Sequence, residues 1–292
     1  MKIFLIFLAF LIGCLLLSSL TAWPIAYWLE WNIRPDKWVE TWGKLIALLL
    51  FFPWIRYLGF AGLPAVGWSL PRAQATRQLA LGFARGIVVM APFAAFLVLI
   101  DLRSPNLSGD WAPLLLKALF AGIIGGLLIG LVEETFFRGA MLRYARRVAA
   151  APIALIATTT LYAGVHFIEV PSPPQHAELS LISGLQLTLS GLADYPQAFD
   201  LSSFVSLCVL GLIFAHVALR DGHIFQAAGL HAGIVFTVGL LKTFTQVNDQ
   251  HAWFFGVGSY DRISGWFSAI GLSLVLAMEL YKARRAARPA NS

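Results

Sequence analysis

The sequence has few charged residues and almost no cysteine. Only 12% of its 292 residues are charged, whereas a soluble domain carries about 25%. Cys14 and Cys208 are its only cysteines, and both lie in apolar runs, so neither a disulfide framework nor a cysteine-rich metal cluster is expected. These deficits argue against a soluble domain and against a disulfide-stabilised one.

Hydrophobic residues take the place of the missing charge. They make up 59% of the chain, with a mean hydropathy of +0.75. Several charge-free stretches have the roughly 20 residues that a helix needs to cross about 30 Å of hydrocarbon. The first of them runs from Ile3 to Leu29. The expected fold is therefore all-α, a polytopic membrane protein.

Eight transmembrane helices are predicted from these stretches. They cover residues 3–23, 42–60, 80–100, 112–142, 151–168, 201–219, 224–242 and 263–282. The fourth is long enough that its last turns should emerge from the bilayer. No internal repeat is evident, which gives little support to an inverted-repeat transporter.

The distribution of basic residues predicts the topology. The net charge is +6, but the Lys and Arg residues flank the hydrophobic segments, so membrane lipids are expected as partners and nucleic acid is not. No Lys or Arg occurs from Val148 to Leu219, and the loop at 169–200 within that stretch carries four acids. The positive-inside rule then places both termini in the cytoplasm, and the expected location is the bacterial inner (plasma) membrane.

Several other polar features have an ordinary structural interpretation. Arg85 lies about one turn inside the third helix, where its head can reach the interface, and His216 and His223 lie near helix ends. The apolar stretch at 179–192 of the long loop fits a packed linker or a substrate lid about equally well.

The fourth helix carries a stripe of residues that should face another helix. Gly122, Gly126 and Gly130 recur at every fourth position, which lets a neighbouring helix approach closely. Glu134 and Arg138 continue the same stripe. Charged groups within a spanning helix are costly in lipid, so these two should face the protein interior.

The two adjacent acids of this helix should differ in role. Glu134 and Arg138 are four residues apart with the acid first, the favourable order for a helix ion pair, and the arginine should keep Glu134 ionised. Glu133 lies about 100° around the helix and lacks a local partner, so it could serve as a general base. A buried ion-pair network that only locks helices together explains the same residues equally well.

Two histidines could complete a site for proton transfer. His166 ends the fifth helix, and His231 lies well inside the seventh, flanked by Gly229 and Gly233. Each is a weak signal alone. Together with Glu133 they form a set that can move protons between the fourth, fifth and seventh helices.

These residues resemble the motifs of the CPBP family, which contains type II CAAX prenyl endopeptidases and bacteriocin-processing membrane proteins. The segment EETFFRG, which begins at Glu133, is similar to the motif EExxxR. Tyr162 to His166 resembles FxxxH with Tyr in place of Phe, and His231 resembles the first residue of HxxxN. The resemblance covers roughly residues 112–242.

The resemblance implies peptide-bond hydrolysis inside the membrane. Glu133 would activate water with help from His166, Glu134 and Arg138 would hold the geometry, and His231 would stabilise the oxyanion. Where the family's third motif has Asn, this chain has Val235, so one expected donor is missing. The corresponding division is 1–111 with three helices, a catalytic core at 112–242, and a C-terminal helix and basic tail at 243–292.

A metal-free site is expected, although zinc is an alternative. Glu133, His166 and His231 could supply three ligands and leave a fourth position for water. No HExxH motif is present, and a coordinated Glu133 would compete with its use as a base.

Three functions remain open at this point. An intramembrane endopeptidase would act on a membrane-associated peptide or protein. A non-enzymatic immunity or assembly factor could retain the polar core for structure, and Val235 favours it. A proton-coupled transporter is disfavoured by the missing repeats. The oligomeric state and the substrate do not follow from the sequence.

Overall fold

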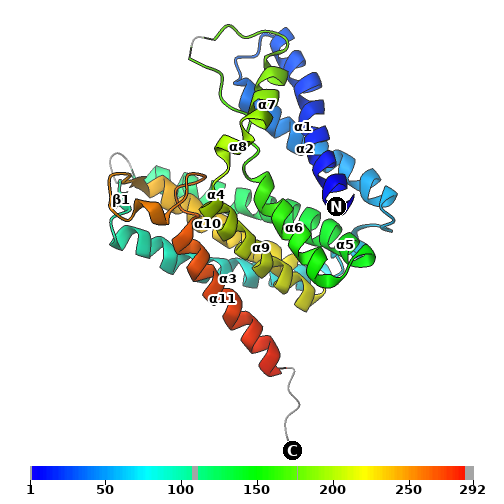
Figure 1. Cartoon of the computed structure of the whole chain (residues 1–292), viewed down its shortest axis with the longest axis vertical. Coiled ribbons are helices and arrows are strands. Elements are labelled where there is room, and N and C mark those ends of the chain that lie inside the picture. The colour runs from blue at the N-terminus through cyan, green and yellow to red at the C-terminus, as the bar shows by residue number, and fades with distance from the viewer. Residues whose placement is uncertain (1, 107–110, 176, 287–292) are drawn as a thin grey trace, which may run out of the picture. The chain divides into compact units, whose positions relative to one another are not determined.

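The structure is a computed structural model that describes residues 2–106, 111–175 and 177–286. Its chain divides into two compact units, one made of Met1–Gly62 and Tyr144–Phe199 and the other of Leu63–Arg143 and Asp200–Ser292 (Figure 1). Nearly all regular structure is helical, as expected. The helices of the predicted core are divided between the units, and the predicted three-part division of the chain stays a prediction.

The first unit consists of helices joined by long loops. Its elements are α1 (Lys2–Trp28), α2 (Pro35–Tyr57), α6 (Ala151–Val165), α7 (Ser183–Ala193) and the short α8 (Tyr195–Ala198). The first helix packs against α2, α6 and α7. The helix α5 (Leu142–Val148) begins in the other unit and ends in this one.

The second unit holds most of the predicted core. Its elements are η1 (Leu63–Val66), α3 (Arg72–Leu99), β1 (Arg103–Pro105), α4 (Trp111–Glu134), the π-helix η2 (Thr135–Met141), α9 (Leu201–Asp221), α10 (Phe225–Phe244), β2 (Thr245–Val247), η3 (Phe254–Gly256) and α11 (Trp266–Ala286). The two strands pair antiparallel, with Arg103 opposite Val247. The sequence had given no sign of this small sheet.

Glycines allow α10 to lie against both α3 and α4. On the α4 side, a Cβ added at Gly126 would meet the carbonyl oxygen of Ala232, and one at Gly130 that of Ala228. On the other side, Gly86 of α3 meets Gly233 of α10 at the level of their Cα atoms. The predicted close approach of a helix to the glycine stripe is confirmed, and the partner is α10.

The loop at 169–200 packs within its own unit. Its helix α7 lies against α1, where Ser19 and Thr188 share a hydrogen bond of 2.6 Å. The indole nitrogen of Trp23 donates to the carbonyl oxygen of Ser180 at 3.0 Å, and Gly184 lies directly against the Trp23 ring. These buried contacts favour the packed linker over the lid.

Seven helices among the described residues are long and apolar enough to cross a membrane, which agrees with a polytopic integral membrane protein. The predicted fifth span is the exception. Its helix α6 has only 15 residues, or about 22 Å, and is too short to cross the hydrocarbon unaided. The prediction that both termini lie in the cytoplasm counts this helix as a span, and it stays a prediction.

Other helix boundaries differ from the prediction for local reasons. The second helix begins seven residues early, because Pro35 at its first position and Asp36 in its first turn are good helix starters. The third begins at Arg72 after Pro71, because its polar first turns are helical but lie outside the apolar run that predicts the span. The fourth is interrupted at Thr135 by the π-helix and continues as α5 to Val148.

Candidate active site

The polar motif of the fourth helix lies where α4 becomes a π-helix. Glu134 is the last residue of α4, and all seven residues of η2 are buried. A π-turn holds more residues than an α-turn, and such turns are rare and frequent at functional sites. Gly139 allows η2 to pass closely over the carbonyl oxygen of Val66, and Trp68 donates to the Thr135 hydroxyl at 2.9 Å. These contacts fix the turn that carries Arg138.

Glu134 is the centre of the polar cluster. Its Oε1 accepts one hydrogen bond from Nη1 of Arg138 at 2.9 Å and another from Nδ1 of His231 at 3.0 Å. The three side chains are 0%, 3% and 5% exposed. Arg138 also donates through Nη2 to the carbonyl oxygen of Gly211 at 3.1 Å. The predicted ion pair is confirmed, and Glu134 additionally orients a histidine, which the helical spacing had not indicated.

Glu133 lies on the other side of the same imidazole. Its Oε2 is 3.8 Å from Nε2 of His231, and its side chain is 30% exposed. This oxygen has no hydrogen-bond partner among the described residues. Because an ionised Glu134 can only accept, Nδ1 of His231 carries a proton, and Nε2 is the nitrogen that faces Glu133.

One aromatic residue of the cluster was missed in the sequence. The fully buried ring of Phe214, on α9, stacks on His231 with centroids 4.7 Å apart and planes inclined by 13°. The guanidinium carbon of Arg138 lies 5.1 Å from the same ring centroid. Phe214 therefore holds both the imidazole and the guanidinium by stacking and cation–π contacts. Nothing distinguishes it in sequence from the other apolar residues of α9.

His166 belongs to the other unit, where it caps the end of α6. Its Nδ1 donates to the carbonyl oxygen of Tyr162 at 2.6 Å, and the two rings meet edge to face with centroids 4.8 Å apart. The carbonyl can only accept, so this contact fixes the tautomer with the proton on Nδ1. The expected approach of His166 to Glu133 stays a prediction.

The expectation of a metal-free site, with zinc as the alternative, stays a prediction as well. Among the described residues, no three His, Cys, Asp or Glu side chains are grouped as a metal would require. The zinc alternative depends on His166, together with Glu133 and His231. Val235 lies one turn after His231 on α10 and presents only an apolar side chain where a polar donor was expected.

The arrangement has the parts of a proton-transfer site. One carboxylate is buried and holds its neighbours in place, and a second is partly exposed and faces an oriented imidazole. When Nε2 of His231 also carries a proton, the two carboxylates balance one guanidinium and one imidazolium. Charge balance of this kind lowers the cost of burying ionised groups in a membrane protein.

Comparison with known protein families gives one match that includes this cluster. Residues 115–237 match the family described as type II CAAX prenyl endopeptidase Rce1-like, a range that contains Glu133, Glu134, Arg138, His166 and His231. Comparison with curated proteins and with solved structures gives no match. The matched region runs from the start of α4 into α10, as the resemblance of the motifs predicted. The match supports the family that the motifs resemble, and residues 115–237 are similar to the Rce1-like CAAX endopeptidases.

Proposed function

We propose that the chain is an intramembrane endopeptidase that hydrolyses a peptide bond of a membrane-associated protein or peptide with a water activated by Glu133. The family supports a CAAX-type membrane protease in general. The observation that carries the finer proposal is the position of Glu133, whose Oε2 faces Nε2 of His231 while Nδ1 is held by Glu134.

The roles follow from the chemistry of these groups. The Glu133 carboxylate takes a proton from water, and the resulting hydroxide attacks the carbonyl carbon of the scissile bond. Nε2 of His231, when protonated, donates to the oxyanion that forms. Collapse of this intermediate breaks the C–N bond, and the proton from Glu133 goes to the leaving amine. His166 is assigned a supporting role in holding the water.

Glu134, Arg138 and Phe214 act through His231 and are positioning residues. They fix the imidazole by a hydrogen bond, by a shared ion pair and by stacking. Fixed donors are effective because they need no reorganisation as charge develops in the transition state. The site also lies on helices and not on loops, which favours a defined geometry.

The experiment is cleavage of membrane-anchored reporter peptides by the purified full chain in nanodiscs. One peptide carries a prenylated C-terminal CAAX sequence and the other lacks the prenyl group, so the pair also reports on the lipid. Glu133→Gln keeps the size of the side chain but cannot accept the proton. We expect it to slow cleavage by roughly 10²–10⁴-fold, the usual contribution of a general base.

Glu178→Gln is the matched control, because Glu178 is exposed in the loop of the first unit and its loss removes the same charge. This variant should cleave at the rate of the unaltered chain. Equal cleavage by the Glu133→Gln variant and the unaltered chain would contradict the proposal.

Val235 is the observation that favours the second candidate, a non-enzymatic immunity or assembly factor. An apolar side chain at this position removes a donor that the motif would supply. Under this alternative the cluster only joins α4, α9 and α10, and the unaltered chain cleaves neither peptide. Val235→Asn would then be the informative variant, since a gain of cleavage would identify a site that lacks one donor.

A further inference from the structure

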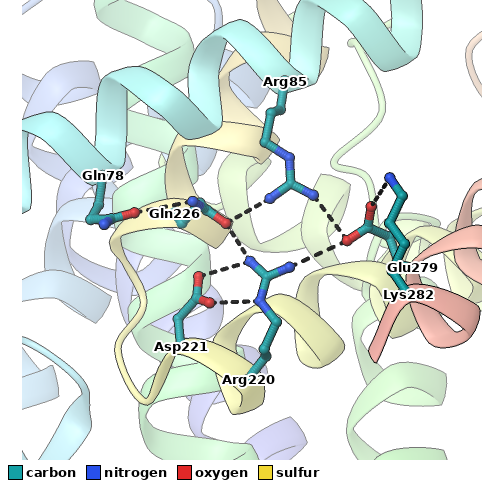
Figure 2. A network of polar contacts seen from close by, with 7 residues as sticks. All are labelled: Gln78, Arg85, Arg220, Asp221, Gln226, Glu279 and Lys282. Carbon is teal, nitrogen blue, oxygen red and sulfur yellow. Dashed lines mark hydrogen bonds and ion pairs between the residues drawn. The ribbon is translucent and has the colours of Figure 1, made fainter. Parts of the chain in front are cut away.

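Three cations, Arg85, Arg220 and Lys282, converge near the C-terminal ends of α9 and α11, beside the middle of α3. They come from α3, α9 and α11, and Figure 2 shows them around the carboxylate of Glu279. Lys282 lies 3.4 Å from Oε1 of Glu279, and both arginines contact Oε2. Snorkelling alone, the interpretation of Arg85 from the sequence, does not account for this network.

The two guanidinium groups share the same pair of acceptor oxygens. Arg85 donates to Gln226 Oε1 at 2.6 Å and to Glu279 Oε2 at 3.0 Å. Arg220 donates to the same Gln226 oxygen and lies 3.3 Å from the same Glu279 oxygen (Figure 2). Gln78 accepts from the amide nitrogen of Gln226 at 3.0 Å and so turns the amide oxygen toward the arginines. Two like charges are thus held close together.

The acids of the network do not balance its cations. Asp221 forms an ion pair with Arg220 at 2.7 Å, and Glu279 forms ion pairs with all three cations. Three cations and two carboxylates leave a net charge of +1. Arg284 follows in the last turn of α11 and adds to the excess. An anion is therefore attracted to this cluster.

The cations lie outside and the shared carboxylate lies behind them. The side chains of Arg85, Arg220 and Lys282 are 37%, 36% and 72% exposed, whereas that of Glu279 is 13% exposed. Exposed cations would add little to a network that only joined helices, because exposed ion pairs contribute little to the free energy of unfolding. An incoming anion would meet guanidinium groups first.

Exposed apolar side chains adjoin this polar group. In the sequence, Leu219 precedes Arg220, Met278 precedes Glu279 and Tyr281 precedes Lys282. These apolar side chains are 36%, 54% and 66% exposed. Both helices are long and apolar enough to cross a membrane, where their exposed apolar faces would contact acyl chains. A ligand here would therefore be amphiphilic, with a charged head beside hydrocarbon.

We propose that this cluster binds the phosphodiester headgroup of an anionic lipid. Phosphate oxygens are good acceptors for guanidinium groups, which can grip them in pairs. Basic pockets between membrane helices near the polar interface bind such headgroups. Gln226, which accepts from both arginines, would hold them in place before the lipid arrives. This site goes beyond the proposed proteolysis and does not depend on it.

Lipid retention by the purified full chain tests the proposal. Native mass spectrometry and titration would compare phosphatidylglycerol, which is anionic, with phosphatidylcholine, which is zwitterionic. We expect preferential retention of phosphatidylglycerol. Arg85→Gln and Arg220→Gln should each weaken it about fivefold, as expected for one basic group at an anionic headgroup. Glu279→Gln should tighten binding by about threefold, because it removes the competing carboxylate.

Arg285→Gln is the matched control, since it removes the same charge from an exposed position of the same helix. Its effect should stay below about twofold, as for a screened surface charge. Equal retention of the two lipids would contradict the proposed site. An equal loss of phosphatidylglycerol binding in Arg285→Gln and Arg85→Gln would contradict it as well. Binding of inorganic phosphate as tight as that of phosphatidylglycerol would contradict the proposal that the ligand is a lipid. None of these measurements uses protease activity, so they test the lipid site independently of the proposed function.

Discussion

The contrast between the two adjacent acids is the sharpest prediction for the folded state. Glu134→Gln should destabilise the chain strongly and Glu133→Gln should not. Glu134 Oε1 is the common acceptor for Arg138 at 2.9 Å and His231 at 3.0 Å, and the Glu134 side chain is fully buried. Glu133 is 30% exposed, and its Oε2 has no hydrogen-bond partner among the described residues.

The magnitude follows from what each substitution leaves behind. With Gln at 134, Arg138 keeps its hydrogen bond to the carbonyl oxygen of Gly211 but loses the charge that balances it. Leaving one buried partner uncompensated costs about 3–5 kcal/mol. Replacing Glu133 leaves no such charge, and its cost should stay below about 1 kcal/mol. Thermal unfolding in detergent should separate the two variants by on the order of 10 °C.

A double variant distinguishes the ion pair from a general loss of packing. Glu134→Gln combined with Arg138→Met removes both buried charges and keeps most of the volume. It should be more stable than Glu134→Gln alone, because no uncompensated charge remains. Equal destabilisation by Glu133→Gln and Glu134→Gln would refute the difference in roles. A double variant that is less stable than both single variants would refute the electrostatic explanation.

Three further predictions concern packing, pH and topology. Gly126→Ala should destabilise the folded chain by about 1–3 kcal/mol, since its Cβ meets the backbone of α10. Gly125→Ala should stabilise it by up to about 1 kcal/mol, because nothing lies within 4 Å of that Cβ. Changes in the thermal unfolding temperature that have the same sign would contradict this prediction. Burial lowers the pKa of His223 below its usual 6.5, so the unfolded chain binds a proton first as the pH drops. The free energy of unfolding should therefore fall below about pH 6.5. His223→Gln should reduce this pH dependence, and an unchanged pH dependence would exclude His223 as its cause. Reporter fusions after Ser292 and within 177–182 should report opposite sides of the membrane, and identical reports would contradict the predicted topology.

The chemistry of the site could be predicted because it is local in sequence. The pair of Glu134 and Arg138 follows from a four-residue spacing, and the glycine stripe predicts a close helix on the same face. Both depend only on helical periodicity, which a short segment determines. The cost of isolated charges in lipid then requires partners, and His231, a weak signal alone, became a candidate together with the acids.

The rest of the site depends on contacts between segments far apart in sequence. The π-helix from Thr135 to Met141 has the composition of an ordinary helix, so nothing within the segment indicates its wider turns. Phe214 is one of many apolar residues of α9 until the fold stacks it on His231. The hydrogen bond of His231 to Glu134 joins residues 97 positions apart, and no periodicity encodes it.

The same backbone contacts that pack α10 also set the geometry of the cluster. Gly126 and Gly130 let the α4 backbone lie directly on α10, and His231 lies on α10 between the residues that these two glycines meet, Ala232 and Ala228. Backbone atoms in contact leave little freedom in the separation of two helices, whereas long side chains between them would allow several packings. The distance from Glu134 to His231 is therefore set by glycines one and two turns before the acid. A methyl group at Gly130 would move the imidazole away from both acids without altering any group that takes part in the proposed chemistry.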